Sequence, residues 1–309
     1  MGLRLLVYGD LHLGPDDDRR AYERPDLDEI DPDAVVSLGD VIDDGTDHDH
    51  GRRGRAFFDH LNGADVPVVA VPGDRDPTNA TRQLVDGLAD VVLAGDRVLA
   101  GEELPGGADL DGLSLVAHGC EAFDATPTLP YTEFDPVDPR TTTNPDTIDW
   151  VADDVGDQVE EIVGAYLAGD ASVDDVGDEL GVHGSARERL AGYLDDVAAE
   201  YESLGSLLAS ADGETVLLSH RSPFNTTFDY RVDAEGLDAR IHRGSIPLKM
   251  AVARTAPMLT LSGHSHRRGR DTVETVRGQR LAFNPGSPGV AVVELDRDRR
   301  RVEIETPPF

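Results

Sequence analysis

The stretch LRLLVYGDLH occupies residues 3–12 and contains the pattern that decides the fold. Its first part, Leu3–Tyr8, is short and largely apolar and ends at a Gly-Asp turn, which predicts a buried strand that opens into a loop. Asp10 and His12 flank Leu11, so their side chains project to one side of the strand end while Leu11 points into the core. A carboxylate and a neutral imidazole placed in this way are natural ligands for Zn, Mn or Fe. Asp-x-His alone is a common sequence, so the prediction depends on whether the pattern recurs.

The same arrangement, an apolar run that ends in Asp or His, recurs along the chain. The further motifs are Gly39-Asp40, Gly73-Asp74-Arg75-Asp76, Ser219-His220 and Gly263-His264-Ser265-His266. A single histidine at a strand end is more often a hydrogen-bonded structural residue, but independent accidents at every strand end are improbable. We therefore interpret these side chains as one metal centre, in which the two oxygens of Asp40 can bridge two cations.

The spacing of apolar runs predicts an α/β fold with two sheets. Predicted strands at 3–8, 34–38 and 66–71 alternate with predicted helices at 53–61 and 78–88, which is a β-α-β-α-β order. Short strands then follow at 91–93, 97–99 and 113–117, consistent with a second sheet. Strand character resumes at 214–219. After a helix at 245–254, the sequence predicts a β-meander with strands at 258–262, 273–276, 280–283, 290–295 and 301–305.

The middle of the chain differs in composition from the rest. Residues 125–145 are rich in Pro, Thr and Asp and read as a loop, whereas 149–167 and 186–209 show helical periodicity with acidic outer faces. We predict a core formed by 1–124 and 213–309. Residues 125–212 would be a helical insertion, either a cap over the site or a surface for a partner; an ordinary helical connection is the alternative.

The charge is strongly negative. The formal net charge is −33, from 61 acidic and 28 basic residues, and only Lys249 among the latter is a lysine. Such a surface repels polyanions at ordinary salt, which argues against broad nucleic-acid binding. At molar salt, however, the Debye length falls to roughly 3 Å and the self-repulsion is screened. A composition with many Asp and almost no Lys resembles that of proteins from salt-loving archaea. The alternative explanation of the charge, a disordered chain, does not fit the recurring apolar runs.

The single cysteine, Cys120, excludes an intrachain disulfide framework and fits a reducing compartment. No apolar run approaches the length that crosses a bilayer, and residues 1–7 are too short for the apolar part of a signal peptide. We expect a cytoplasmic protein without membrane association. The sequence does not indicate an oligomeric state.

The ordered set of motifs resembles the calcineurin-like metallophosphoesterase superfamily, which has D-x-H, G-D, G-[N/D]-x-D, a strand-end His and G-H-x-H in this order. The segment Leu217–Phe224 is similar to the family's LLSHxPP, and Asn284–Ser287 to its NPGS turn. His242–Ser245 is similar to an H-x-G-S segment of Icc-related archaeal and bacterial phosphoesterases. The resemblance implies a four-layer α-β-β-α sandwich of two mixed sheets flanked by helices, here with the helical insertion.

The resemblance also implies how the ligands are divided between two divalent cations. One cation would be held by Asp10, His12 and His266, and the other by Asp74, His220 and His264, with Asp40 between them. Manganese is the first candidate, and Fe, Zn, Ni and Mg are alternatives. Cations about 3.5–4 Å apart share a hydroxide that attacks phosphorus in line. Asp40 and His220, together with Arg75, would form the catalytic set.

Two positions depart from the family pattern, because its G-N-H-[D/E] motif reads Gly73-Asp74-Arg75-Asp76 here. An aspartate can bind a hard cation where the family has asparagine. Arg75 replaces the histidine that is thought to protonate the leaving oxygen. A guanidinium cannot give up its proton but pairs with phosphate oxygens, so we predict that Arg75 binds substrate and is not an acid. The alternative is that it only neutralises Asp74 or Asp76.

Without a built-in acid, substrates with good leaving groups are favoured, and family branches that lack the histidine prefer diesters. His118 and His242 are candidate replacement acids, and Arg221 and His242 are candidate substrate contacts; the alternatives are plain structural or surface residues.

The leading hypothesis is a binuclear-metal-dependent phosphodiesterase that acts on a small or nucleotide-type phosphoester. A nuclease of the same superfamily is one alternative, although the charge of −33 argues against it. A non-catalytic scaffold that binds partner proteins is another, and it is disfavoured because every ligand position carries a competent side chain.

Overall fold

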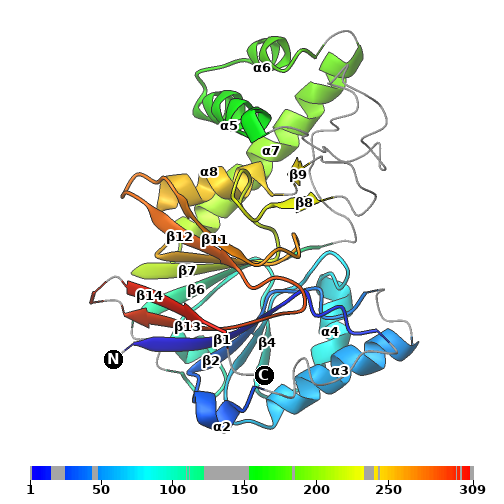
Figure 1. Ribbon diagram of the computed structural model, residues 1–309, viewed down its shortest axis with the longest axis vertical. Helices are drawn as coiled ribbons and strands as arrows, with labels where there is room; N and C mark the ends of the chain where they lie inside the picture. The colour runs from blue at the N-terminus through cyan, green and yellow to red at the C-terminus, as the bar shows by residue number, and fades with distance from the viewer. Residues whose placement is uncertain are drawn as a thin grey trace.

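Two six-stranded mixed sheets pack face to face and are flanked by helices in the computed structural model (Figure 1). This confirms the predicted α-β-β-α architecture. The structure describes residues 2–14, 25–43, 48–108, 110, 112–121, 153–182, 185–232, 240–242, 244–296, 298–299 and 301–306. Within this part of the chain, no helix combines the length and the apolar character needed to cross a membrane.

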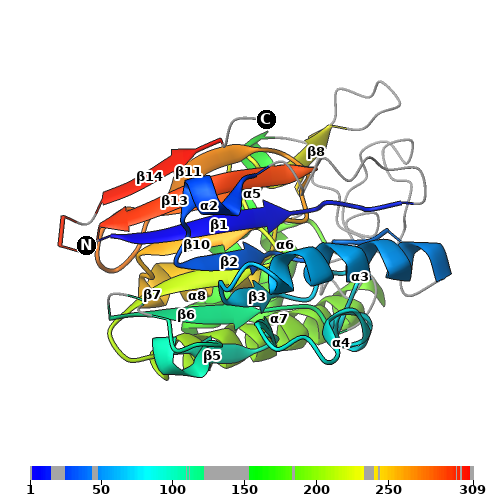
Figure 2. The same ribbon diagram turned by 90° about the horizontal axis from the view of Figure 1, so that it is seen from below.

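The first sheet has the strand order β14-β13-β1-β2-β3-β4 (Figure 2). Its strands are β1 (Leu3–Gly9), β2 (Ala34–Ser37), β3 (Val68–Ala70), β4 (Val91–Leu93), β13 (Gly289–Asp296) and β14 (Arg301–Glu305). The strands β1 to β4 are parallel, whereas β13 pairs antiparallel with β1 in a register that sets Gly9 opposite Gly289. The ends of β1, β2 and β3 therefore release their loops at one edge.

Alternation along β1 divides its side chains between two apolar layers. Leu5 and Val7 point into the core between the sheets, whereas Leu6 and Tyr8 face the outer helices. Tyr8 packs edge-on against Phe57 with ring centroids 5.3 Å apart. The outer helices on this side are α2 (Leu27–Ile30), α3 (His48–Asn62) and α4 (Thr78–Val85).

The second sheet has the order β11-β12-β10-β7-β6-β5. Its strands are β5 (Arg97–Leu99), β6 (Leu113–His118), β7 (Glu214–Ser219), β10 (Leu259–Ser262), β11 (Gly269–Val273) and β12 (Arg280–Asn284), and a 3-10 turn, η1 (Gly101–Glu103), follows β5. A separate ribbon pairs β8 (Tyr230–Val232) with β9 (Arg240–His242).

The predicted meander after residue 258 is wrong. β10 and β12 pair in parallel, β11 lies outside them, and β13 crosses to the first sheet. The strand predicted at 273–276 is found at 269–273 instead, because β11 is a half-exposed edge strand whose alternating Arg270, Asp271 and Thr272 give little apolar signal.

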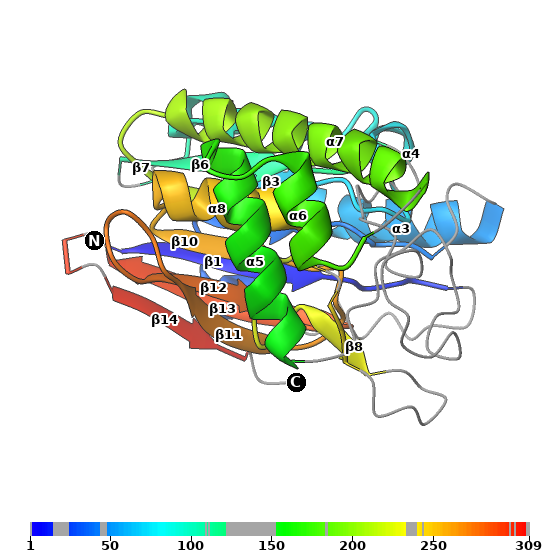
Figure 3. The ribbon, with the colours of Figure 1, turned by 90° about the horizontal axis from the view of Figure 1, so that it is seen from above.

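Helices α5 (Asp153–Ala168), α6 (Val173–Glu179), α7 (Ser185–Ala209) and α8 (Ile246–Thr255) lie above the second sheet (Figure 3). The first half of α7 packs on α5 and α6 through Leu190 and Leu194, whereas Leu204 and Leu208 pack on the sheet. Because β6 and β7 are parallel neighbours, their connection must cross over, and the second half of α7 serves as that crossover helix. The division into core and insertion remains a prediction, and residues 125–152 and 183–184 of the predicted insertion lie outside the described residues.

Polar contacts also fix α5 to the loop that follows β7. The side-chain amide of Asn225 donates to Asp157 Oδ1 at 2.7 Å and to Glu160 Oε2 at 3.0 Å. Lys249, buried on α8, places Nζ 3.4 Å from the same Glu160 oxygen and donates to the Phe224 carbonyl. The helical segment formed by α5, α6 and α7 thus contacts, through α5, the loop that begins at His220.

Candidate metal centre

Loops from both sheets bring the seven predicted ligands together as two neighbouring groups. The first group is Asp10, His12, Asp40 and His266, and the second is Asp74, His220 and His264. Within each group the candidate ligand atoms lie within 4.8 Å of one another. The first sheet supplies every carboxylate and His12, and the second sheet supplies the other three imidazoles.

Asp40 faces both groups. Its Oδ2 lies 3.8 Å from His12 Nε2, and its Oδ1 lies 3.5 Å from His220 Nε2. Oδ1 also accepts the backbone N–H of Arg75 at 2.9 Å, which orients the carboxylate. One oxygen toward each group is the orientation that a bridging ligand needs.

Contacts of Nδ1 on the far side of two imidazoles direct Nε2 toward the other candidate ligands. His220 Nδ1 donates to the Leu38 carbonyl at 2.8 Å, so in neutral His220 the lone pair is on Nε2. His12 Nδ1 lies 2.6 Å from Asp43 Oδ1. His12 Nε2 and His266 Nε2 approach to 2.8 Å, so both rings point at one place.

The backbone at the site is held in an unfavourable conformation. Five of the seven candidates have left-handed φ values: Asp10 49°, His12 48°, Asp40 51°, His264 69° and His266 59°. Residues other than glycine rarely adopt this region, and such strain persists mainly at functional sites, where the surrounding structure enforces it.

Two glycines allow the loops after β2 and β3 to touch. A Cβ on Gly73 would lie 2.2 Å from Asp40 Oδ1, and one on Gly39, whose φ is 91°, would lie 2.6 Å from the Gly73 Cα. Any side chain at Gly73 would therefore push Asp40 away from the second group.

Asp10 provides a test of whether a cation fits. Its side chain is fully buried; Oδ1 accepts the His264 N–H at 2.9 Å, while Oδ2 has no hydrogen-bond partner among the described residues. Burial raises the pKa of Asp10 to about 7 and that of Asp40 well above its usual range. A buried, unpartnered carboxylate oxygen is costly unless a positive charge compensates it, and carboxylates with imidazoles are the donors that divalent cations take. The residues present fit a metal centre.

The imidazoles respond to the same burial. Burial lowers the pKa of His12 and of His264, which keeps both in the neutral form that binds metals. Burial would also lower the pKa of His220, but the charge of Asp40 and the hydrogen bond to Asp74 Oδ1, at 2.8 Å, raise it well above its usual value. Positive charge at this point is therefore favoured, and a divalent cation would supply it in place of the proton.

Asp76 organises the site, a role that the sequence did not reveal. Its Oδ1 accepts the N–H groups of Asp40 and Gly73, each at 2.9 Å, and its Oδ2 accepts that of Val41 at 2.8 Å. Burial raises the pKa of Asp76 to about 6. The only signal was its place in the Gly73–Asp76 motif, because two of its three partners are backbone amides of a loop far away in the sequence.

Arg75 is exposed, and within the part of the chain that the structure describes its guanidinium makes no ion pair or hydrogen bond. Neither Asp76, which is bonded to backbone amides, nor Asp74, which faces His220 and His264, is neutralised by it.

Arg221 instead lies in a buried ion pair. Its Nη1 is 3.3 Å from Glu200 Oε1 on α7, and that oxygen is 3.5 Å from His118 Nε2. His118 Nδ1 contacts Asp96 Oδ1 at 2.7 Å. Burial would lower the pKa of His118, but the two carboxylates outweigh it and raise the pKa to about 9. A phosphate contact by Arg221 and an acid role for His118 stay predictions.

His242 lies on β9, opposite Tyr230. Its side chain is outside the described residues, so its predicted role remains a prediction.

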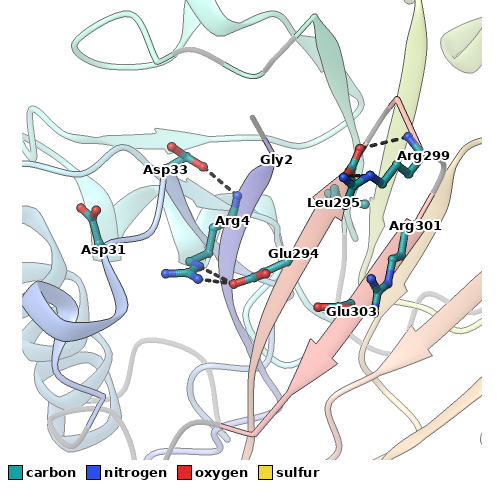
Figure 4. Close-up of a pocket in the computed structure, with 10 residues that line it drawn as sticks. Gly2, Arg4, Asp31, Asp33, Glu294, Leu295, Arg299, Arg301 and Glu303 are labelled. Atoms are coloured by element: carbon teal, nitrogen blue, oxygen red, sulfur yellow. Dashed lines mark hydrogen bonds and ion pairs between the residues drawn. The ribbon is translucent and has the colours of Figure 1, made fainter.

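A cavity of about 430 Å³ lies far from these loops, at the other end of β1 (Figure 4). It is lined by Arg4, Glu294, Asp296 and Arg301 among others. Arg4 and Glu294 form an ion pair there, and Asp33 Oδ2 accepts the Arg4 backbone N–H at 2.7 Å.

No protein-family model and no curated protein matches the chain. One solved structure aligns over 100% of both chains with 11% identity and a TM-score of 0.53. The protein TT1561 of Thermus thermophilus aligns over 100% of both chains with 15% identity and a TM-score of 0.47. The 5'-nucleotidase precursor of Thermus thermophilus aligns with 12% identity and a TM-score of 0.49, over 99% of this chain and 54% of its own.

The NAD nucleotidase of Haemophilus influenzae aligns with 10% identity and a TM-score of 0.47, over 99% of this chain and 55% of its own. The chain thus spans about half the length of the two nucleotidases. A likeness at such identities concerns the fold alone, and the alignment with a TM-score of 0.53 supports a shared fold.

Proposed function

We propose that this protein is a binuclear-metal-dependent phosphoesterase of the calcineurin-like metallophosphoesterase superfamily. The observation that carries the proposal is the convergence of two ligand groups on the two oxygens of Asp40. Beside them lies a buried Asp10 oxygen that no described residue hydrogen-bonds. When bound, a pair of divalent cations would activate water near neutral pH and offset charge on the phosphoryl oxygens. Manganese is the first candidate, with Fe, Zn, Ni and Mg as alternatives, because the donors are oxygen and imidazole nitrogen.

The residues around the groups have separate tasks in this proposal. Asp40 and His220 hold the reacting centre, each fixed by a hydrogen bond to the backbone. The exposed guanidinium of Arg75, next to Asp74 in the sequence, would pair with two phosphate oxygens of the substrate. Because Arg75 keeps its proton, the leaving oxygen must depart without help from this position. We therefore propose a phosphodiester of the small or nucleotide type as the substrate.

The helical segment is proposed as a cap on this site. The contacts of Asn225 and Lys249 with α5 support this, because they join the segment to the loop that follows His220. A cytoplasmic location and adaptation to concentrated salt remain proposals that rest on composition.

The test combines metal analysis with two model substrates in molar KCl. We expect the purified protein to hold two Mn²⁺ and to hydrolyse bis-p-nitrophenyl phosphate faster than p-nitrophenyl phosphate. Metal-bound protein that prefers the monoester would contradict the diester assignment alone. Protein that neither binds Mn²⁺ nor turns over either compound would favour the scaffold, and cleavage of single-stranded DNA in the same buffer would favour the nuclease.

A further inference from the structure

One turn, Asn284–Ser287, joins the two sheets next to the candidate metal centre. It leaves β12 of the second sheet and enters β13, which pairs with β1 of the first sheet. Each ligand group contains residues from both sheets, so its geometry depends on how the sheet edges are held relative to each other. The chain crosses between the sheets here, directly beside that edge.

Asn284 is fully buried and contacts the loop that carries His264 and His266. Its Nδ2 donates to the Gly263 carbonyl at 2.6 Å and to Ser265 Oγ at 3.0 Å. Its Oδ1 accepts the N–H of Gly286 at 2.8 Å, which closes the turn on itself. Ser265 is the residue between the two histidines, so Asn284 restrains both from the middle of their loop.

Ser287 contacts the opposite side of the centre. Its Oγ donates to the backbone carbonyl of Asp10 at 2.8 Å. Asp10 is one of the residues with left-handed φ, and so are His264 and His266. Strained residues hold their conformation only when other contacts enforce it, and the turn supplies such contacts on both sheets.

We propose that Asn284 and Ser287 are positioning residues that clamp the two sheet edges together and so set the affinity of both cation sites. This inference rests on the proposed function, because it assumes that the two groups hold cations. The clamp predicts an asymmetry. Among the described residues, the Ser287 hydroxyl bonds to Asp10, a member of the first group, and therefore acts mainly on that group. Asn284 restrains the loop that carries His264 and His266 and therefore acts on both groups.

The experiment titrates Mn²⁺ into metal-stripped full-length protein by calorimetry and fits the two sites separately. Removing a residue that orients metal ligands typically weakens binding by about 10- to 100-fold. We expect Asn284→Ala to weaken both sites by about that factor and Ser287→Ala to weaken the first site more than the second. The matched control is Asn79→Ala. Asn79 is exposed, and within the described residues its side chain hydrogen-bonds only Arg82, so this variant should bind Mn²⁺ as the wild type does.

The melting temperature of each metal-free variant separates positioning from loss of fold. If Asn284→Ala does not fold, Ser265→Ala replaces it, since this change removes one Asn284 contact and leaves both histidines in place. The clamp would be overturned if Ser287→Ala and whichever of Asn284→Ala and Ser265→Ala folds both bound two cations with wild-type affinity. The proposed function would then still stand. Equal weakening of both sites by Ser287→Ala would overturn the asymmetry. A wild-type protein without cation binding would instead refute the proposed function.

Discussion

The two ends of the β-sandwich differ in whether their charged side chains are buried or exposed, and in whether they are paired. At the candidate metal centre, buried carboxylates lie together, those of Asp10 and Asp40 on left-handed backbone. One Asp10 oxygen has no hydrogen-bond partner in the part of the chain that the structure describes. Around the cavity at the other end, Arg4 pairs with Glu294, Arg299 with Asp296 and Arg301 with Glu303, all in positions that are at least partly exposed (Figure 4). A buried carboxylate without a positive partner indicates that a ligand supplies the missing charge. Ion pairs near the surface contribute little to the free energy of unfolding.

The largest effect is expected for Asp40→Asn, which tests the metal-centre end directly. An amide offers one oxygen and no negative charge, so it cannot bridge two cations. We expect activity on bis-p-nitrophenyl phosphate to fall on the order of a thousandfold or more, with the fold intact. Asp59→Asn, which removes only an exposed partner of Arg55, is the control. Unchanged turnover by Asp40→Asn would remove the bridging role.

A pH series tests whether the buried carboxylate of Asp10 lacks a compensating positive charge in metal-free protein. Burial raises the pKa of Asp10 to about 7, above its value in the unfolded chain. The folded state therefore holds the Asp10 proton more tightly than the unfolded chain does. This stabilises the fold fully below about pH 4, and the stabilisation, about a few kcal/mol, is lost as the pH rises through about 7. The free energy of unfolding of the metal-free wild type should fall over that range relative to Asp10→Asn. Parallel curves for the two proteins would contradict this reading.

A smaller effect is expected from adding a methyl group where the loops after β2 and β3 touch. In Gly73→Ala the new Cβ would meet Asp40 Oδ1, so the loops must separate, at a cost of about 1–3 kcal/mol. Urea denaturation of metal-free protein would measure it. Gly63→Ala is the control, because the nearest atom to a Cβ there is 3.8 Å away. Equal midpoints for both variants would show that the loops tolerate separation.

Arg75→Ala should raise KM for the diester about tenfold with less change in kcat, since the guanidinium binds substrate and donates no proton. Arg75→His would restore an acid at this position and should increase the ratio of monoesterase to diesterase activity. Steady-state kinetics on the two nitrophenyl substrates would check both expectations. A fall in kcat alone for Arg75→Ala would assign this side chain to the chemical step.

The smallest effect is expected at the opposite end of the sandwich. Arg301→Ala removes an exposed ion pair and should change the free energy of unfolding by no more than about 0.5 kcal/mol, without any change in activity. A clear loss of turnover would mean that the two ends are coupled, and the contrast between them would fail.

Prediction from sequence succeeded where the signal was local. The predicted strand at 214–219 matches β7, and the helix predicted at 245–254 matches α8 within one residue. It failed at β11, whose polar edge residues hide it, and it did not find α6, a seven-residue helix that begins after the capping residue Ser172. Short or half-exposed elements bury too little apolar surface to leave a pattern.

The sequence by itself determined which residues form the candidate site, because each ligand follows a strand whose apolar run is visible over a few neighbouring positions. Only the tertiary structure decided that Asp40 faces both groups, that Asp76 holds the backbone of the loops, and that Arg221 is paired with Glu200. The same Asp or Arg side chain can be a ligand, a loop support or half of an ion pair. Which of these it becomes depends on distant segments that packing brings beside it, and adjacent residues carry no record of them.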